Sequence, residues 1–153
     1  MTKRKIFTGV NNKTLRKKSE KVKQIDKKLK KLITDMLDTL DEKEGLGLAA
    51  PQVGVNQRLL LARLNSGDPE EMVVAFINPE IIHRSEEIVI MEEGCLSLPG
   101  EYDEVPRAQE IRVQFQDIHG NEHILDLSDL NARILQHETD HLDGILFTDY
   151  LEK

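Results

Sequence analysis

The sequence predicts an α+β fold with mostly antiparallel sheets packed around a central helix, and an amphipathic helix near the N-terminus. Three observations support this prediction. A helical repeat of apolar residues covers about residues 22–42, short strand-like segments follow between residues 59 and 127, and a second helical pattern covers about residues 129–142. Helices and strands are thus segregated along the chain, as is typical of α+β domains.

The first helix is predicted from apolar residues that recur at intervals of three and four, with lysine on the opposite face. These apolar residues are Ile25, Leu29, Leu32, Ile33, Met36, Leu37 and Leu40. The strand predictions rest on runs of apolar and β-branched residues bounded by turn residues. The expected strands are residues 59–64, 72–77 and 87–91, with a turn at 65–69, and a hairpin of 111–117 and 123–127.

Length and composition predict one domain. With 153 residues, of which 39% are hydrophobic, the chain can form one core of ordinary size, so residues 1–153 are expected to fold together. It has no run of eighteen apolar residues, which argues against a membrane span, and no apolar stretch behind the basic N-terminus, which argues against a secretory signal. The single cysteine, Cys95, suits a reducing compartment. A cytoplasmic location is therefore expected, with an organelle or a phage-infected host cytosol left open.

Charge is divided unevenly along the chain. Residues 1–31 contain thirteen Lys and Arg but only Glu20 and Asp26, a balance of +11, so the rest of a chain with net charge −7 carries −18. A basic run of this kind is usually a solvated face, and the alternative is a contact with an acidic surface such as RNA. The acidic remainder argues against sequence-specific nucleic-acid binding.

The segment His137-Glu138-Thr139-Asp140-His141 carries the clearest chemical signal. On an α-helix the two imidazoles lie one turn apart, about 6 Å along the axis, so both can reach one metal ion with Glu138 beside it. Two nitrogen ligands and a nearby base are what a metallohydrolase needs. Ser128 or Asp129 can cap this helix, and Gly144 can end it. A surface helix that carries two histidines by chance is the alternative.

A third protein ligand is needed for a catalytic site of the zinc type. Peptidases with an extended motif place it six residues after the second histidine, but that residue is Phe147, and the twelve residues after His141 are too few for the glutamate of another class. The ligand must therefore lie upstream, and the candidates are Cys95, His83, His119, His123 or a carboxylate. Cys95 is the strongest donor, because thiolate binds borderline and soft divalent metals well, although a buried inert cysteine is the common alternative.

Three motifs in this order resemble the signature motifs of the peptide deformylase family. They are residues 45–52 (Gly-Leu-Gly-Leu-Ala-Ala-Pro-Gln), 93–97 (Glu-Gly-Cys-Leu-Ser) and 136–144 (Gln-His-Glu-Thr-Asp-His-Leu-Asp-Gly). The resemblance covers nearly the whole chain, including Val105-Pro106-Arg107-Ala108. It implies a hydrolase that removes the formyl group from the N-terminal formylmethionine of new polypeptides and releases formate.

The resemblance also implies roles for particular residues. Cys95, His137 and His141 would bind one divalent metal, iron(II) first, with nickel, cobalt or zinc as alternatives. Glu138 would act as general base. The Gln52 side-chain amide and the Leu96 backbone N–H would stabilise the oxyanion.

Substrate contacts are expected along the glycine-rich segment. The peptide would pair with backbone near Gly47 and Gly94. Met91, Leu130 and Ile134 would line the methionine pocket, although all three also suit a core. Glu93 is also expected to contact the substrate. It is further expected to pair with Arg107 and hold the Cys95 loop. The partners would be N-formylmethionyl peptides and nascent chains, with no membrane.

The sequence departs from the family pattern in several places. It lacks the proline usual ahead of Leu15-Arg16, has Asp129 where many relatives have glycine, and has Tyr102 where some have arginine. Without the longer C-terminal helix of many bacterial members, ribosome docking would fall to the basic N-terminal face. Two alternative functions remain open: a metal amidase or peptidase acting on another acyl group, and a non-catalytic domain that binds acidic surfaces through residues 3–31.

Overall fold

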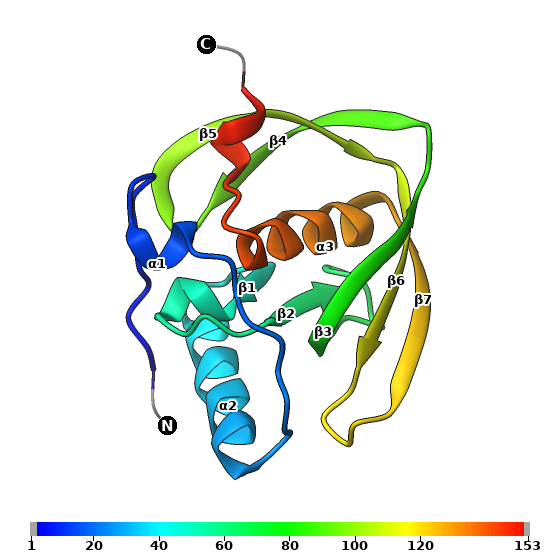
Figure 1. Ribbon diagram of the computed structural model, residues 1–153. Coiled ribbons are helices and arrows are strands. Elements are labelled where there is room, and N and C mark those ends of the chain that lie inside the picture. The colour runs from blue at the N-terminus through cyan, green and yellow to red at the C-terminus, as the bar shows by residue number, and fades with distance from the viewer. Residues whose placement is uncertain (1–2, 152–153) are drawn as a thin grey trace.

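The computed structural model describes residues 3–151 and shows three α-helices, two 3-10 turns and seven strands in this part of the chain (Figure 1). In chain order they are α1 (Lys13–Arg16), α2 (Lys27–Glu42), β1 (Gly47–Ala49), η1 (Ala50–Val53), β2 (Leu59–Leu64), β3 (Met72–Arg84), β4 (Ile88–Cys95), β5 (Leu98–Ala108), β6 (Glu110–Gln116), β7 (Glu122–Ser128), α3 (Asp129–Leu142) and η2 (Phe147–Tyr150).

The strands form two antiparallel sheets, as the sequence predicted. One has five strands in the order β1-β2-β3-β6-β7, and the other is the β4-β5 ribbon. The predicted hairpin is confirmed as β6-β7, with Val113 opposite Leu125. In Figure 1, α3 lies between the β4-β5 ribbon and the larger sheet, while α2 lies on the other side of β1 and β2.

Strand β2 explains how both helices are held. Its side chains alternate between two cores: Leu60 and Ala62 pack in the cluster that contains α3, and Leu59 and Leu61 pack in the cluster that contains α2. Because successive side chains point to opposite faces and both faces are covered, the strand is a nearly continuous apolar run. Helix α3 therefore packs on one face of the larger sheet, and its residues 132–142 are all buried.

Helix α2 begins later than residue 22. The Asn78 side chain binds the backbone of Val22 twice, with the Val22 N–H donating to Oδ1 at 2.8 Å and Nδ2 donating to the Val22 carbonyl at 2.9 Å. These bonds hold the chain extended up to Asp26, whose carboxylate accepts the Leu29 N–H at 2.9 Å and caps the helix. The tertiary contact thus overrides the helical pattern of the first turn.

Four strands differ from the expected ones. The expected strand at 87–91 is β4, which continues to Cys95. The expected strand at 72–77 continues as β3 to Arg84, past a register irregularity at Asn78-Pro79, where Asn78 has φ 51°. Strands β1 and β5 were not predicted, since β1 is short and β5 contains two prolines, a glycine and three acidic residues. Proline and charge are tolerated in β5 because it forms an exposed two-stranded ribbon rather than a sheet interior.

No helix within residues 3–151 is long and apolar enough to cross a membrane.

Candidate metal centre and active site

Helix α3 and the end of β4 bring three metal-binding side chains together. His137 and His141 lie one turn apart on α3, with ring centroids 5.1 Å apart. Cys95 ends β4, where a register shift after Gly94 places it opposite Leu98, and its Sγ lies 3.3 Å from His141 Nε2. One ligand atom from each of the three residues lies within 4.8 Å of the other two. The other candidate third ligands, His83, His119 and His123, are not part of this cluster.

The donor set fits one divalent ion. Metal–nitrogen distances of about 2.0–2.1 Å and a metal–sulfur distance of about 2.3 Å would place tetrahedral ligands roughly 3.4–3.6 Å apart. The observed Sγ–Nε2 separation of 3.3 Å is close to that value. One thiolate and two imidazoles suit borderline divalent metals such as iron(II), cobalt, nickel or zinc better than magnesium or calcium.

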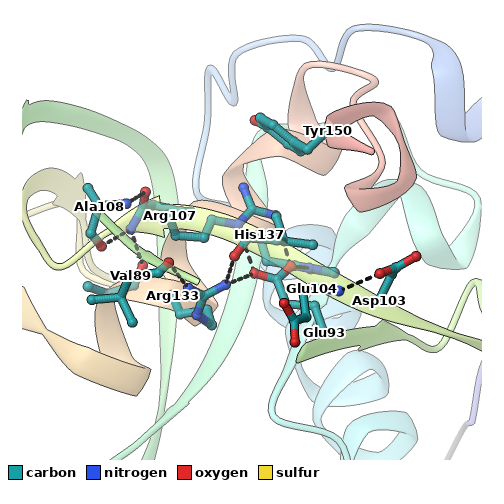
Figure 2. Close-up of polar contacts among 12 residues, drawn as sticks. Val89, Glu93, Asp103, Glu104, Arg107, Ala108, Arg133, His137 and Tyr150 are labelled. Atoms are coloured by element: carbon teal, nitrogen blue, oxygen red, sulfur yellow. Dashed lines mark hydrogen bonds and ion pairs between the residues drawn. The ribbon is translucent and has the colours of Figure 1, made fainter. Parts of the chain in front are cut away.

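Glu93 fixes the orientation of His137. Its Oε1 lies 2.8 Å from His137 Nδ1, which leaves Nε2 to face Cys95. Arg107 donates to both carboxylate oxygens, from Nε at 2.8 Å and from Nη2 at 2.9 Å, and Arg133 Nη1 donates to Oε2 at 2.5 Å. Figure 2 shows the Glu93 carboxylate among these side chains. Burial opposes ionisation of Glu93, but hydrogen bonds from His137 and Arg107 outweigh it and lower its pKa to about 2.

The expected Glu93–Arg107 pair is therefore present, and Glu93 also lines the cavity described below. It is only 7% exposed, and both of its oxygens accept internal hydrogen bonds. Its position in the structure is that of a support for His137.

Glu138 lies beside the cluster rather than in it. Its Oε2 is 3.9 Å from His137 Nε2, and no residue in the range 3–151 provides a hydrogen-bond partner for its buried Oε1. Burial raises the pKa of Glu138 to about 7. The close approach of β1 requires a glycine, since a Cβ on Gly47 would lie 2.7 Å from both Cγ and Oε2 of Glu138.

Gln52 points its amide group toward the same cluster. Its Oε1 accepts the Ala49 N–H at 2.9 Å, which fixes which end of the amide faces inward. Its Nε2 lies 3.1 Å from Ser97 Oγ and 3.6 Å from Cys95 Sγ. Leu96 follows Cys95 in the turn between β4 and β5, so its backbone is adjacent to the sulfur.

A cavity of about 970 Å³ opens at this cluster and is lined by Gly47, Gly94, Leu130, Ile134, His137 and Glu138, among others. Met91 is the exception among the expected substrate contacts. It does not line this cavity, and it is 44% exposed on β4. The residues that follow it on β4, Glu92 to Cys95, do line the cavity.

Sequence reasoning missed Arg133, Asp140 and Tyr150. Arg133 lies one turn before His137 on α3, and Arg107 Nη1 donates to Asp140 Oδ2 at 2.6 Å. An arginine within the apolar stripe of a helix was the available signal for Arg133. Asp140 lies inside the motif itself, but nothing in the sequence indicated the partner of either residue.

The chain is similar to known proteins over nearly its whole length. The family model described as polypeptide deformylase matches residues 4–153. A peptide deformylase of Afipia carboxidovorans is 45% identical over 145 residues, which are 95% of this chain and 85% of that protein.

Solved structures of peptide deformylases are also similar to this chain. The peptide deformylase of Ehrlichia chaffeensis in complex with actinonin is 42% identical with a TM-score of 0.92, covering 100% of this chain and 91% of that one. A probable peptide deformylase of Synechococcus phage S-SSM7 is 41% identical with a TM-score of 0.89, covering 96% and 99%.

Proposed function

The chain belongs to the polypeptide deformylase family and is a hydrolase that removes the formyl group from the N-terminus of newly made polypeptides; from this premise we propose that Cys95, His137 and His141 are its metal ligands and Glu138 its general base. The observation that carries the proposal is the convergence of one sulfur and two imidazoles within 4.8 Å at the cavity. Residues 1–153 would act as one catalytic domain.

The metal would be iron(II), with nickel, cobalt or zinc as alternatives that the same donors accept. A bound divalent ion would supply Lewis acidity and lower the pKa of water toward ~7. The thiolate ligand requires that Cys95 stay reduced, which favours the cytoplasm as the site of the reaction.

Glu138 would move the proton. In the hydrolysis, water adds to the formyl carbon, the bond from that carbon to the methionine nitrogen breaks, and formate and a free amine result. Glu138 would accept a proton from the water and deliver it to the leaving nitrogen. Burial raises the pKa of the Glu138 carboxyl, which makes it a better proton acceptor and so favours the role of general base.

Gln52 and Leu96 would stabilise the charge that develops on the formyl oxygen. The Gln52 Nε2 is directed toward Cys95 and its carbonyl end is held by Ala49, so this donor is already oriented before substrate binds. With the Leu96 backbone N–H it would form the oxyanion site, and one such donor typically lowers the barrier by roughly 3–4 kcal/mol.

The substrate would enter the cavity as an extended N-formylmethionyl peptide. Gly47 and Gly94 line the cavity and their backbone would pair with that of the peptide, while Leu130 and Ile134 would contact the methionine side chain. Glu93 is assigned to holding His137 instead, and Met91 to the surface of β4. Nascent chains would reach the site at the ribosome, and the exposed lysines of residues 17–31 would supply a basic face for ribosomal RNA.

The test is formate release after anaerobic reconstitution with iron(II), comparing formyl-Met and acetyl-Met peptides. We expect activity on the formyl peptide alone and a large loss in Glu138→Ala. Preference for acetyl-Met would instead indicate an amidase of another specificity. Full activity in Glu138→Ala would overturn the assigned mechanism, and an inactive iron-loaded wild type would favour a binding role.

A further inference from the structure

Tyr150 lies on the C-terminal turn η2, outside the cavity, yet it contacts the residues that hold His137. Its Oη donates to Asp140 Oδ2 at 2.7 Å. Its ring covers the guanidinium of Arg107, with 4.8 Å between Arg107 Cζ and the ring centroid. In Figure 2, Tyr150 comes from this C-terminal segment and Arg107 from β5.

The contacts of Tyr150 continue without a gap to the proposed metal ligand. Asp140 Oδ2 accepts from Arg107 Nη1 at 2.6 Å as well as from Tyr150. Arg107 then binds both oxygens of Glu93, and Glu93 Oε1 lies 2.8 Å from His137 Nδ1. Each of these groups is oriented by the next one outward.

We propose that Tyr150 is a positioning residue for His137 and acts through Asp140, Arg107 and Glu93. The proposal rests on the assignment of His137 as a metal ligand. Tyr150 touches neither substrate nor metal in this account. Its effect is to hold the imidazole in the orientation that binds the ion, and so to slow loss of the ion.

The physical basis is the position of Tyr150 at the outer end of a buried polar network. Asp140 is 8% exposed and Arg107 5%, whereas Tyr150 is 42% exposed and so separates the pair from solvent. Buried hydrogen bonds are stronger where water is excluded, and removing a partner weakens the remaining ones. Burial and Asp140 raise the pKa of the Tyr150 hydroxyl to about 12, so it remains a donor at neutral pH.

The turn that carries Tyr150 is itself held firmly. Arg16 Nη1 lies 2.7 Å from Asp149 Oδ2, which ties η2 to α1. Phe147, at the start of the turn, stacks on His137 with ring centroids 6.2 Å apart. Both contacts lie within three residues of Tyr150 on its N-terminal side, so they hold the turn that carries it in place.

The test measures release of Zn²⁺ from loaded enzyme into excess chelator. Tyr150→Phe keeps the ring over Arg107 and removes only the hydroxyl, whereas Tyr150→Leu removes both. Loss of a direct partner of a ligating histidine typically weakens metal binding 10–100-fold. For this more distant residue we expect release to be about 3–10-fold faster in Tyr150→Phe, and faster again in Tyr150→Leu.

The matched control is Tyr102→Phe, which also removes one phenolic hydroxyl. Tyr102 is 66% exposed on β5 and lines the cavity, but it is not part of the hydrogen-bond network behind His137. Metal release from Tyr102→Phe should equal that of wild type, and KM for a formyl-Met peptide should be unchanged in Tyr150→Phe. Wild-type release in both Tyr150 variants would overturn the proposal, even if the free energy of unfolding of the metal-free protein falls.

The variant His137→Ala separates the proposal for Tyr150 from the assignment of His137 as a metal ligand. If His137→Ala retains wild-type metal affinity, the ligand assignment fails. If His137→Ala loses the metal and Tyr150→Phe releases it at the wild-type rate, only the role of Tyr150 fails.

Discussion

Replacing Glu93 by glutamine is expected to weaken both the fold and the metal site. The carboxylate accepts four hydrogen bonds, two from Arg107, one from Arg133 and one from His137, and it is 7% exposed. Glutamine has nearly the same shape, but it carries no charge, and its NH₂ group would face a donor. The change therefore leaves buried positive charge without its main counter-charge.

The size of the effect follows from these partners. Removing one member of a buried ion pair typically costs 3–5 kcal/mol. Here Arg107 keeps Asp140, and Arg133 keeps the carbonyls of Val105 and Val89 at 2.9 and 2.7 Å. We therefore expect the lower end, about 3 kcal/mol in the free energy of unfolding. Because Glu93 also orients His137, metal affinity should fall about 10–100-fold.

Two assays separate these effects. Urea denaturation of the metal-free protein measures the change in the fold, and competition with a chelator measures the change in metal affinity. Glu92→Gln is the matched control, because Glu92 is the neighbouring exposed carboxylate on β4, and its unfolding free energy should change by less than about 0.5 kcal/mol. The reasoning is refuted if Glu93→Gln matches Glu92→Gln in both assays.

Three further predictions follow from single contacts. In Gly47→Ala, the new Cβ would lie 2.7 Å from Glu138 Cγ and displace the base, so kcat should fall about 100-fold with metal content unchanged, as a turnover assay and metal analysis would show. Gly144→Ala should lower the free energy of unfolding in urea by at least about 2 kcal/mol, because Gly144 has φ 74° and its Cβ would lie 2.3 Å from the Arg16 carbonyl oxygen. Hydrogen bonds from Lys31 and Arg4 lower the pKa of the buried Asp35 below its ordinary 3.8. The stabilisation that the Asp35 carboxylate provides is therefore complete above pH 3.8 and is lost as the pH falls through the lowered pKa. The gap in unfolding free energy between wild type and Asp35→Asn should accordingly narrow as pH falls from about 5 toward 2, and a gap that widens would contradict this.

Apolar runs and turn residues in the sequence correctly predicted the strands and turns that depend on neighbouring residues. The apolar run at 59–64 is β2, and the turn residues at 118–121 close the β6-β7 hairpin. The α+β class and the antiparallel sheets are confirmed by the structure and its neighbours. Strand β5 could not be predicted, because its prolines and acidic residues are acceptable only in an exposed ribbon.

The residues of the site were likewise predictable from the sequence only in part. Spacing along one helix brings His137 and His141 together, and the motif order pointed to Cys95 and Gln52 from elsewhere in the chain. Of the network behind His137, only the Glu93–Arg107 pair was predicted. The contacts of Arg133 with Glu93 and of Tyr150 with Asp140 form only through tertiary packing. Asp129 has a left-handed φ of 55°, a backbone conformation that glycine adopts more readily than aspartate.

The central claim is that one sulfur and two imidazole nitrogens bind a single ion. X-ray absorption of the zinc-loaded protein tests it most directly. We expect one sulfur at about 2.3 Å and two nitrogens at about 2.0–2.1 Å, with the sulfur lost in Cys95→Ser. A wild-type spectrum that requires no sulfur would contradict the account.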